Sequence, residues 1–482
     1  MMGLVLHDVT LGLTGRRATV RICGGRVDAI EPVSRPTGPG EVVDGRGGTL
    51  LPGLVDAHAH LLQWAAARRR VPLGAATSAA HAAAILAEAA PPGTDLVRGA
   101  HFHAALWPDR PHKTVLDRVL PDRPAALFSN DLHALWLNSA ALRLLRREHP
   151  TGVFVEDECM ALTAALPAPP PEVADRWVLA ATDAAAARGV TAITDYEYAD
   201  TVADWTRRAA LRAPSTRIRC VIARFALDLA VERGHRTGDV LPEGGGLLGV
   251  GPLKLFLDGS LNTRTAHCHD PYPGGDYRGE ALFAADELLA LTRRAAAHGL
   301  TPALHAIGDA ANALALDTFA ALGTGGRIEH AQLLAPRDVA RFAALGVTAG
   351  VQPAHAPDDR DVADTHWPGR TARAFPYAAL LAAGTRLEFG SDAPVAPLDP
   401  WDAIASAVTR RDDDRAPWHP EQSLSLADAL AASTGGRTDV RVGDPADLVL
   451  TARPLPGLPP DELRDLPITA TVLNGALTHL SR

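Results

Sequence analysis

Two histidines separated by one residue, His58 and His60, form the pair whose spacing most directly suggests chemistry. They end the apolar run Leu54-Val-Asp-Ala-His-Ala-His60, which is typical of a strand. Because side chains alternate between the two faces of a strand, both imidazoles point the same way and can bind one ion. Because the chain has 19 histidines, a pair with this spacing can also arise by chance. Whether His58 and His60 bind a metal therefore has to be judged from residues elsewhere in the chain.

The elements that would position this pair alternate between apolar strands and alanine-rich helical stretches. That texture predicts a parallel sheet covered by helices. The predicted strands are 54–60, 191–195, 217–224, 253–258, 301–305, 327–330, 348–352 and 386–391. Eight such units predict an α/β fold, a (β/α)8 TIM-like barrel with its active site at the C-terminal ends of the strands.

The two ends of the chain are different from this middle part. Short strands with glycine-rich turns occupy residues 1–50, and strands at 447–450 and 468–473 repeat that texture. We therefore predict a small β-sandwich domain built from residues 1–50 and 436–482, around a barrel at 51–435. The gap after His60 is too long for one helix and loop, which predicts an α/β insertion at about 65–172 with a proline-rich exit.

Further residues able to bind a metal occupy the ends of the predicted barrel strands. Lys254 lies in the fourth strand, His305 and His330 end the fifth and sixth, and Asp392 follows the eighth. Each also has an ordinary structural interpretation: a surface lysine, a core histidine with one hydrogen bond, or a helix cap. An ordinary structural role explains any one of these residues easily. It does not easily explain why residues able to bind a metal occur at five separate strand ends.

The chemistry of this set is that of a divalent metal site. Neutral imidazoles and carboxylates suit zinc, which lowers the pKa of a bound water to about 7 and polarises a carbonyl oxygen. Asp392 would accept the proton of the water and pass it to the leaving group. Lys254 would become a ligand by reacting with CO₂ to form a carbamate, a carboxylated lysine that can bridge two ions.

These segments resemble the metal-dependent amidohydrolase superfamily, and specifically its amidohydrolase-3 branch of YtcJ-like and N-substituted formamide deformylase-like proteins. The resemblance covers nearly the whole chain. It is carried by Leu51–His60, Gly189–Asp195, Leu253–Ser260, His305–Asp309, Arg327–Gln332, Phe389–Val395 and Gly443–Val449. It implies the barrel, the sandwich from both termini, and hydrolysis of a C–N bond other than a peptide bond, in an amide, formamide or cyclic amide.

The same resemblance implies roles for individual residues. His58 and His60 would bind the more buried metal, with Asp392 as a further ligand and proton shuttle. His305 and His330 would bind a second metal, and carboxylated Lys254 would bridge one ion to the other. The cofactor is then expected to be a divalent metal, zinc by the nature of its ligands, as one or two ions.

Substrate contacts are expected from four residues. His133 lies in Asn130-Asp-Leu-His133, which resembles the family's segment that covers the active site, although Asn138 close by is equally suited to start a helix. Gln352 and His355 follow the seventh strand and are expected to face the mouth of the barrel. Arg264 is a basic residue near the end of the fourth strand.

Composition points to small-molecule chemistry. The net charge of −9 gives no general attraction to nucleic acid or anionic lipid, and no apolar segment has the length of a membrane helix. We expect a cytoplasmic enzyme with a small-molecule substrate and no nucleic-acid or membrane partner; a homo-oligomer is left open. Two alternatives are a mononuclear zinc deaminase of the same superfamily and a non-catalytic binding protein with the amidohydrolase fold.

Overall fold

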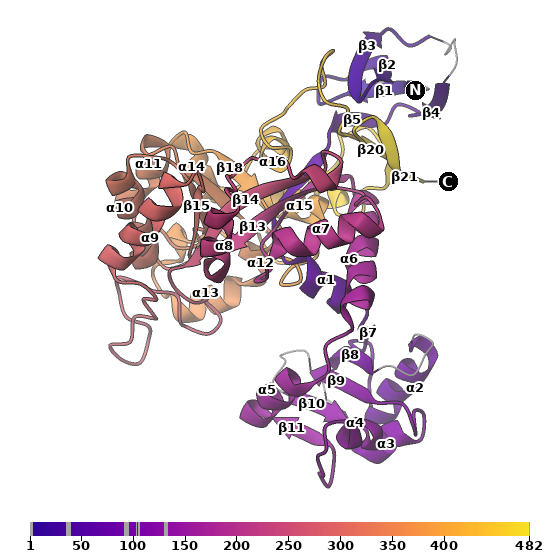
Figure 1. Ribbon diagram of the computed structural model, residues 1–482, viewed down its shortest axis with the longest axis vertical. Helices are drawn as coiled ribbons and strands as arrows, with labels where there is room; N and C mark the ends of the chain where they lie inside the picture. The colour runs from indigo at the N-terminus through magenta and orange to yellow at the C-terminus, as the bar shows by residue number, and fades with distance from the viewer. Residues whose placement is uncertain are drawn as a thin grey trace. The chain divides into compact units, whose positions relative to one another are not determined.

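The computed structural model describes residues 3–34, 40–90, 96–102, 104, 107–129 and 134–481. The chain divides into two compact units (Figure 1). One unit consists of Met1–Trp64 and Val178–Arg482, and the other consists of Ala65–Trp177. Each unit has its own sheets and its own buried core.

Eight parallel strands in the first unit form a barrel, as the sequence predicts. They are β6 (Leu54–Ala59), β12 (Val190–Asp195), β13 (Arg217–Ala223), β14 (Leu248–Phe256), β15 (Pro302–Ala306), β16 (Arg327–His330), β17 (Thr348–Val351) and β18 (Leu387–Phe389). Their order in the sheet follows the chain from β6 to β18. A parallel bridge between Ala59 and Ala393 joins the two ends, so the first and last strands lie side by side.

Helices cover the outer face of the barrel (Figure 1). They are α1 (Leu61–Ala67), α6 (Pro171–Ala186), α7 (Thr201–Leu211), α8 (Leu227–Glu232), α9 (Ala285–Ala297), α10 (Asp309–Leu322), α11 (Pro336–Ala344), α12 (His355–Asp358), α13 (Arg360–His366), α14 (Tyr377–Ala382), α15 (Pro400–Thr409) and α16 (Leu426–Ser433). With helices outside and packed side chains inside, the strands are buried on both faces; all five residues of β15 are buried.

Most strand boundaries differ from the predicted ones by one or two residues, and the start of β14 differs by more. β14 begins at Leu248 rather than Leu253, because Leu248 to Val250 already pair with β13. This extension could not be predicted from the sequence, because Gly249, Gly251 and Pro252 interrupt the run of residues typical of a strand.

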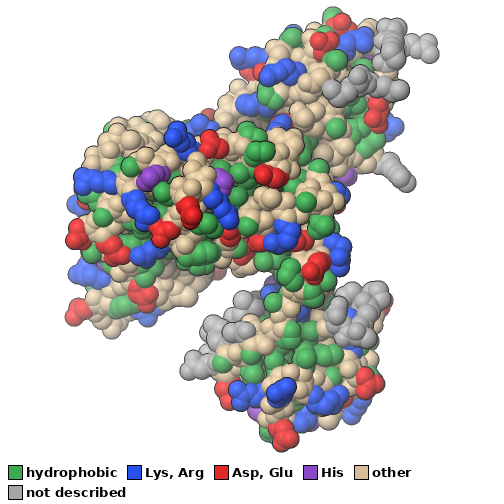
Figure 2. Space-filling model, in the orientation of Figure 1, with side chains coloured by type: hydrophobic (Ala, Val, Ile, Leu, Met, Phe, Trp, Pro, Cys, Tyr) green, Lys and Arg blue, Asp and Glu red, His purple; other side chains and the backbone are tan. Residues whose placement is uncertain are grey.

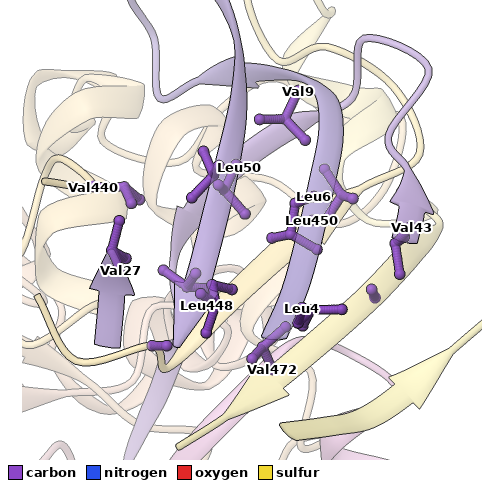
Figure 3. Close-up of a cluster of buried hydrophobic side chains, with 14 of the residues drawn as sticks. Leu4, Leu6, Val9, Val27, Val43, Leu50, Val440, Leu448, Leu450 and Val472 are labelled. Atoms are coloured by element: carbon purple, nitrogen blue, oxygen red, sulfur yellow. The ribbon is translucent and has the colours of Figure 1, made fainter. Parts of the chain in front are cut away.

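Strands from both ends of the chain form one eight-stranded sheet. These are β1 (Gly3–Leu11), β2 (Arg16–Cys23), β3 (Arg26–Glu31), β4 (Gly40–Asp44), β5 (Thr49–Pro52), β19 (Leu448–Thr451), β20 (Ile468–Leu473) and β21 (Ala476–Leu480). The N-terminal β5 pairs with the C-terminal β19. Figure 3 shows side chains of both ends, such as Leu6 and Leu450, gathered in one buried cluster. The predicted joining of strands from both termini is therefore confirmed, as one sheet within the first unit.

The second unit has a five-stranded sheet of its own. Its strands are β7 (Val71–Pro72), β8 (Val97–Phe102), β9 (Ala125–Ser129), β10 (Ala134–Leu137) and β11 (Val153–Val155). They lie side by side in the order β11-β10-β9-β8-β7. Its helices are α2 (Ala79–Ala89), α3 (Lys113–Asp117), α4 (Ser139–Leu144) and α5 (Glu156–Ala165). Two hydrophobic clusters, one centred on Leu127 and one on Leu135, fill the space between sheet and helices.

On the face drawn in Figure 2, Lys and Arg side chains are interspersed with Asp and Glu. Within the described ranges, no helix combines the length and the apolar character that a membrane crossing requires.

Candidate active site

Three side chains meet at the C-terminal ends of β6 and β18. The Nε2 atom of His60 lies 3.3 Å from Oδ1 of Asp392, and the Nε2 atom of His58 lies 3.6 Å from the same oxygen. One ligand atom from each of the three residues falls within 4.8 Å of the others. The alternation of side chains along β6 thus directs both imidazoles to one side of the strand, where they lie close to the carboxylate of Asp392.

Two buried contacts hold the ends of β6 and β18 together. The Asp56 carboxylate accepts hydrogen bonds from the Ser391 hydroxyl at 2.6 Å and from the Ser391 backbone N–H at 3.1 Å. Gly390 makes the close approach possible, because a Cβ atom there would lie 2.5 Å from the His58 backbone nitrogen. The two strands can therefore bring His58 and Asp392 together only with glycine at position 390.

Glu329 fixes the orientation of the His58 ring. Its Oε2 atom lies 2.8 Å from His58 Nδ1, and its Oε1 atom accepts hydrogen bonds from the Tyr196 hydroxyl and Arg327 Nε, each at 2.8 Å. Burial raises the pKa of Glu329, but the charge of Arg327 and the hydrogen bond to His58 outweigh it and hold this pKa well below its usual value. An ionised carboxylate only accepts, so Nδ1 of His58 carries the proton and Nε2 keeps its lone pair.

The ring of Tyr196 completes the support of His58. The two rings are stacked, with centroids 3.8 Å apart and planes inclined by 4°. On the other side of Glu329, Arg327 also pairs with Glu388. Gly350 leaves room for the carboxylate, because a Cβ there would lie 2.1 Å from Glu329 Oε2. His58 is thus held by a network that spans four barrel strands.

Sequence reasoning missed Glu329 because the adjacent residue, His330, was placed inside the barrel. On a regular strand, neighbours point to opposite faces, so only one of the two would enter the site. The φ angle of His330 is 77°, which breaks the alternation at the end of β16. Both side chains consequently reach His58: Glu329 by a hydrogen bond, and His330 with ring centroids 5.0 Å apart.

Left-handed backbone occurs at three non-glycine residues of this region. Besides His330, Ala331 has a φ of 44° and Asp392 a φ of 56°. Such conformations cost on the order of 1–3 kcal/mol each and persist where the surrounding structure requires them. Two of these residues, His330 and Asp392, belong to the candidate site. The conformation of their backbone therefore orients the side chains of the site at a cost in stability.

His305 and His330 lie next to each other, with ring centroids 4.5 Å apart. His330 Nδ1 donates to Gln352 Oε1 at 2.9 Å, and His305 Nε2 donates to the Gly259 carbonyl at 3.1 Å. Each ring therefore has one nitrogen occupied and one with a free lone pair. The free nitrogen of His305 is Nδ1, a buried atom without a hydrogen-bond partner among the described residues.

Lys254 is buried in the same part of the barrel, with 2% of its surface exposed, which rules out a surface lysine. Its Nζ atom has no hydrogen-bond partner within the described part of the chain and lies 4.8 Å from the centroid of the Tyr196 ring. Burial lowers the pKa of Lys254 to about 8, against the opposing charges of Glu329 and Asp392. A neutral amine, the form that reacts with CO₂, is thereby made accessible near neutral pH.

Burial also keeps His58, His305 and His330 neutral. It lowers the pKa of His58 to about 4 and that of His305 to about 3, and the charge of Lys254 adds to both effects. Burial raises the pKa of Asp392, but the hydrogen bond with His60 and the interactions with the neighbouring imidazoles outweigh it and hold that pKa well below its usual value. At neutral pH the site therefore presents imidazole lone pairs and one carboxylate.

These donors fit a divalent metal. Neutral imidazole nitrogens and a carboxylate oxygen are common zinc ligands, and a ligating histidine characteristically donates its other N–H to a carboxylate or a carbonyl group. His58 has this arrangement with Glu329, His330 with the amide oxygen of Gln352, and His305 with a backbone carbonyl. The predicted helix-cap alternative for Asp392 is wrong, because the cap of α15 is Asp399.

The residues predicted to contact substrate fall in different places. His133 lies outside the described residues, and Asn138 caps α4, accepting the Ala141 N–H at 2.8 Å. His355 is buried and contributes to the low pKa of Asp392; its Nε2 atom has no partner among the described residues. Arg264 has its guanidinium carbon 5.4 Å from the Tyr272 ring centroid and donates to the Pro273 carbonyl. Gln352 reaches His330, as described above.

Comparison with known proteins gives the family. The model of the amidohydrolase family matches residues 41–479. The chain is 27% identical to the putative amidohydrolase YtcJ of Bacillus subtilis (strain 168), over 91% of this chain and 90% of that protein. It is 26% identical to the N-substituted formamide deformylase of Arthrobacter pascens, over 95% of this chain and 94% of that protein.

The fold has solved relatives of the same length. An uncharacterized metal-dependent hydrolase from Pyrococcus furiosus superimposes with a TM-score of 0.78 at 23% identity, covering 95% of this chain and all of that one. The barrel, the sheet from both termini and the family match over nearly the whole sequence agree with the resemblance carried by the motifs. The chain belongs to the amidohydrolase family.

Proposed function

We propose that this protein is a metal-dependent hydrolase that cleaves a C–N bond of a small molecule, in an amide, formamide or cyclic amide. The observation that carries the proposal is the convergence of His58, His60 and Asp392 within 4.8 Å, backed by Glu329. The similarity to an N-substituted formamide deformylase supports the bond type. A divalent metal, zinc by the nature of its ligands, would supply the Lewis acidity that activates water and a carbonyl group.

The chain itself supplies the proton transfer. Asp392 is ionised, and its Oδ1 atom faces the two histidines, so its carboxylate can accept a proton from the attacking water. The same carboxyl group then returns that proton to the leaving nitrogen. Burial keeps His58 and His305 neutral by lowering their pKa values, so these two imidazoles hold their lone pairs and do not compete for this proton.

His305, His330 and Lys254 would extend the site to a second ion. The unpartnered Nζ of Lys254 and its lowered pKa favour carboxylation, which would turn the lysine into an oxygen ligand. Substrate would then contact Arg264, Gln352 or His355; the contact with His133 stays a prediction from the sequence.

The direct test is hydrolysis of a panel of N-substituted formamides, simple amides and lactams, measured by release of the amine or acid. Asp392→Asn should lower the rate by about 10²-fold or more, because it removes the general base. Asp276→Asn, at an exposed position, is the matched control and should keep full activity. Full activity of Asp392→Asn on a confirmed substrate would contradict the proposal.

A mononuclear deaminase is the second candidate. Within the described residues, only His58, His60 and Asp392 form a group close enough to hold an ion, and this favours one metal over two. If the protein is a deaminase, it should bind one ion and Lys254 should be unmodified. If it is an amide hydrolase with two ions, Lys254 should be carboxylated and the protein mass should be higher by one CO₂. Metal counting and intact-mass measurement separate the two. Failure on the whole panel with full metal loading would favour the non-catalytic alternative.

A further inference from the structure

A cavity of about 420 Å³ lies within the second unit, Ala65–Trp177. Its volume is that of a site for a small organic molecule. Four arginines line it, Arg69, Arg70, Arg98 and Arg123, together with Trp177 and the proline-rich segment Pro167–Pro170. None of these residues belongs to the candidate active site, so the cavity needs an explanation of its own.

The arginines bring positive charge to a partly buried place. None of the described residues that line the cavity is acidic. Burial lowers the pKa of Arg70 and that of Arg98, and the charge of Arg70 lowers the pKa of Arg98 further, so these two cations oppose each other. Arginine stays charged in proteins, and the repulsion is therefore permanent unless an anion enters.

Within the described part of the chain, Arg70 and Arg98 use only some of their hydrogen-bond donors. Arg98 donates to the Pro167 carbonyl at 2.6 Å, a contact that holds its guanidinium group at the cavity wall. The Nε atom of Arg70 is buried and has no partner among the described residues. A guanidinium group held in this way presents a planar fork that matches a carboxylate or phosphate group.

The rest of the wall is apolar and partly flat. The guanidinium carbon of Arg69 lies 5.7 Å from the centroid of the Trp177 ring, and that of Arg70 lies 5.2 Å from the Phe128 ring. Val97 and Pro169 add apolar surface. An occupant with an anionic group at one end and a flat apolar body at the other would match both halves of the cavity.

We propose that this cavity is a second binding site, for a small organic anion whose carboxylate or phosphate group pairs with Arg70 and Arg98 while its apolar body packs against Trp177. The two anionic groups share the chemistry that the arginines recognise. The site is independent of metal binding, because its residues lie in a different unit from the metal-ligand candidates.

The test is calorimetric titration of the full-length protein with benzoate, phenyl phosphate, inorganic phosphate and uncharged benzyl alcohol. Benzoate or phenyl phosphate should bind and benzyl alcohol should not; the tighter of the two aryl anions identifies the preferred group. Arg70→Gln and Arg98→Gln should each weaken binding about tenfold or more, since each removes hydrogen bonds to a charged group. Trp177→Leu should weaken the aryl anions and leave inorganic phosphate unchanged.

Four controls make the result specific. Arg110→Gln removes the same charge from an exposed position of the same unit and should leave every affinity unchanged. His60→Asn should also leave them unchanged, because it alters only the metal site. Thermal melting checks that each variant folds, and Arg70→Lys keeps the charge without the fork and should bind with intermediate affinity. Absence of binding by all three anions, or equal loss in Arg110→Gln or His60→Asn, would overturn the proposal.

Discussion

At the residue scale, each of three buried imidazoles in the site has one nitrogen occupied by a hydrogen bond. His58 donates to Glu329, His330 to Gln352, and His305 to the carbonyl of Gly259. This fixes which nitrogen carries the proton and leaves the other available to a metal. The partner that should matter most is Glu329, because it is the ionised one.

Glu329→Gln should therefore weaken metal binding by about 10- to 100-fold, since the amide is a poorer acceptor for the His58 N–H than the carboxylate. Competition with a chromogenic chelator measures this affinity. Glu287→Gln, at a pair on the surface with Arg224, is the matched control and should bind metal as the unchanged protein does. Equal affinity in the two variants, with both folded, would show that Glu329 does not support His58.

His305 predicts a pH dependence of stability in the metal-free protein. Its pKa is lowered by burial from 6.5 to about 3 in the folded state. Between these values the unfolded chain binds a proton that the folded chain does not, so the free energy of unfolding falls as the pH drops below 6.5. The slope that one such group contributes is ~1.4 kcal/mol per pH unit.

The melting temperature of the metal-free protein should thus fall less between pH 7 and pH 5.5 in His305→Asn than in the unchanged protein. His298→Asn, which alters an exposed histidine at the end of α9, should retain the original difference between the two pH values. If His305→Asn and His298→Asn behave alike, His305 is not held neutral by burial.

At the scale of elements, the site depends on the junction between the first and last barrel strands. β6 supplies two imidazoles, and the segment after β18 supplies the carboxylate. Asp56 and Ser391 tie the two together, and Gly390 allows the backbones to approach. Small changes in the spacing of these strands would separate Asp392 from both histidines.

Gly390→Ala is expected to open this junction. The added methyl group would lie 2.5 Å from the His58 nitrogen, so the strands must move apart at a cost of about 1–3 kcal/mol. Metal affinity should fall along with the melting temperature. Gly275→Ala is the control, because a Cβ at Gly275 meets nothing within 4 Å. Normal metal affinity in Gly390→Ala would show that the junction tolerates displacement.

Much of the structure at the scale of elements was predictable from the sequence. Apolar runs and helical spacing predicted all eight barrel strands, and strand alternation correctly predicted that His58 and His60 face the same way. The left-handed conformation of His330 could not be predicted, because it depends on contacts between distant strands. For that reason Glu329 was missed, although it stands beside a residue that was singled out.

At the scale of the whole molecule, the first unit joins residues from both ends of the chain in one sheet. β5 pairs with β19, and their side chains share a core with those of β1 and β20 (Figure 3). The β-rich texture of both termini predicted this, whereas the pairing of individual strands could not be predicted from composition. The sheet is separate in function from the site, because none of the metal-ligand candidates lies in it.

Leu448→Ala tests this separation. Leu448 is fully buried in the shared core, and its truncation should cost about 2–5 kcal/mol of stability. The number of bound metal ions at a temperature where the protein is folded should not change. Leu480→Ala, at an exposed position of β21, is the control and should leave the melting temperature unchanged within error. Loss of bound metal in folded Leu448→Ala would mean that the sheet contributes to the site.

The measurement that tests the central claim most directly is anomalous X-ray scattering at the zinc edge from crystals grown with zinc. The account predicts a peak bounded by His58, His60 and Asp392, which disappears in Asp392→Asn and His60→Asn crystals or loses most of its height. A fully loaded crystal with no peak among these three side chains, or with its peak at other residues, would contradict the account.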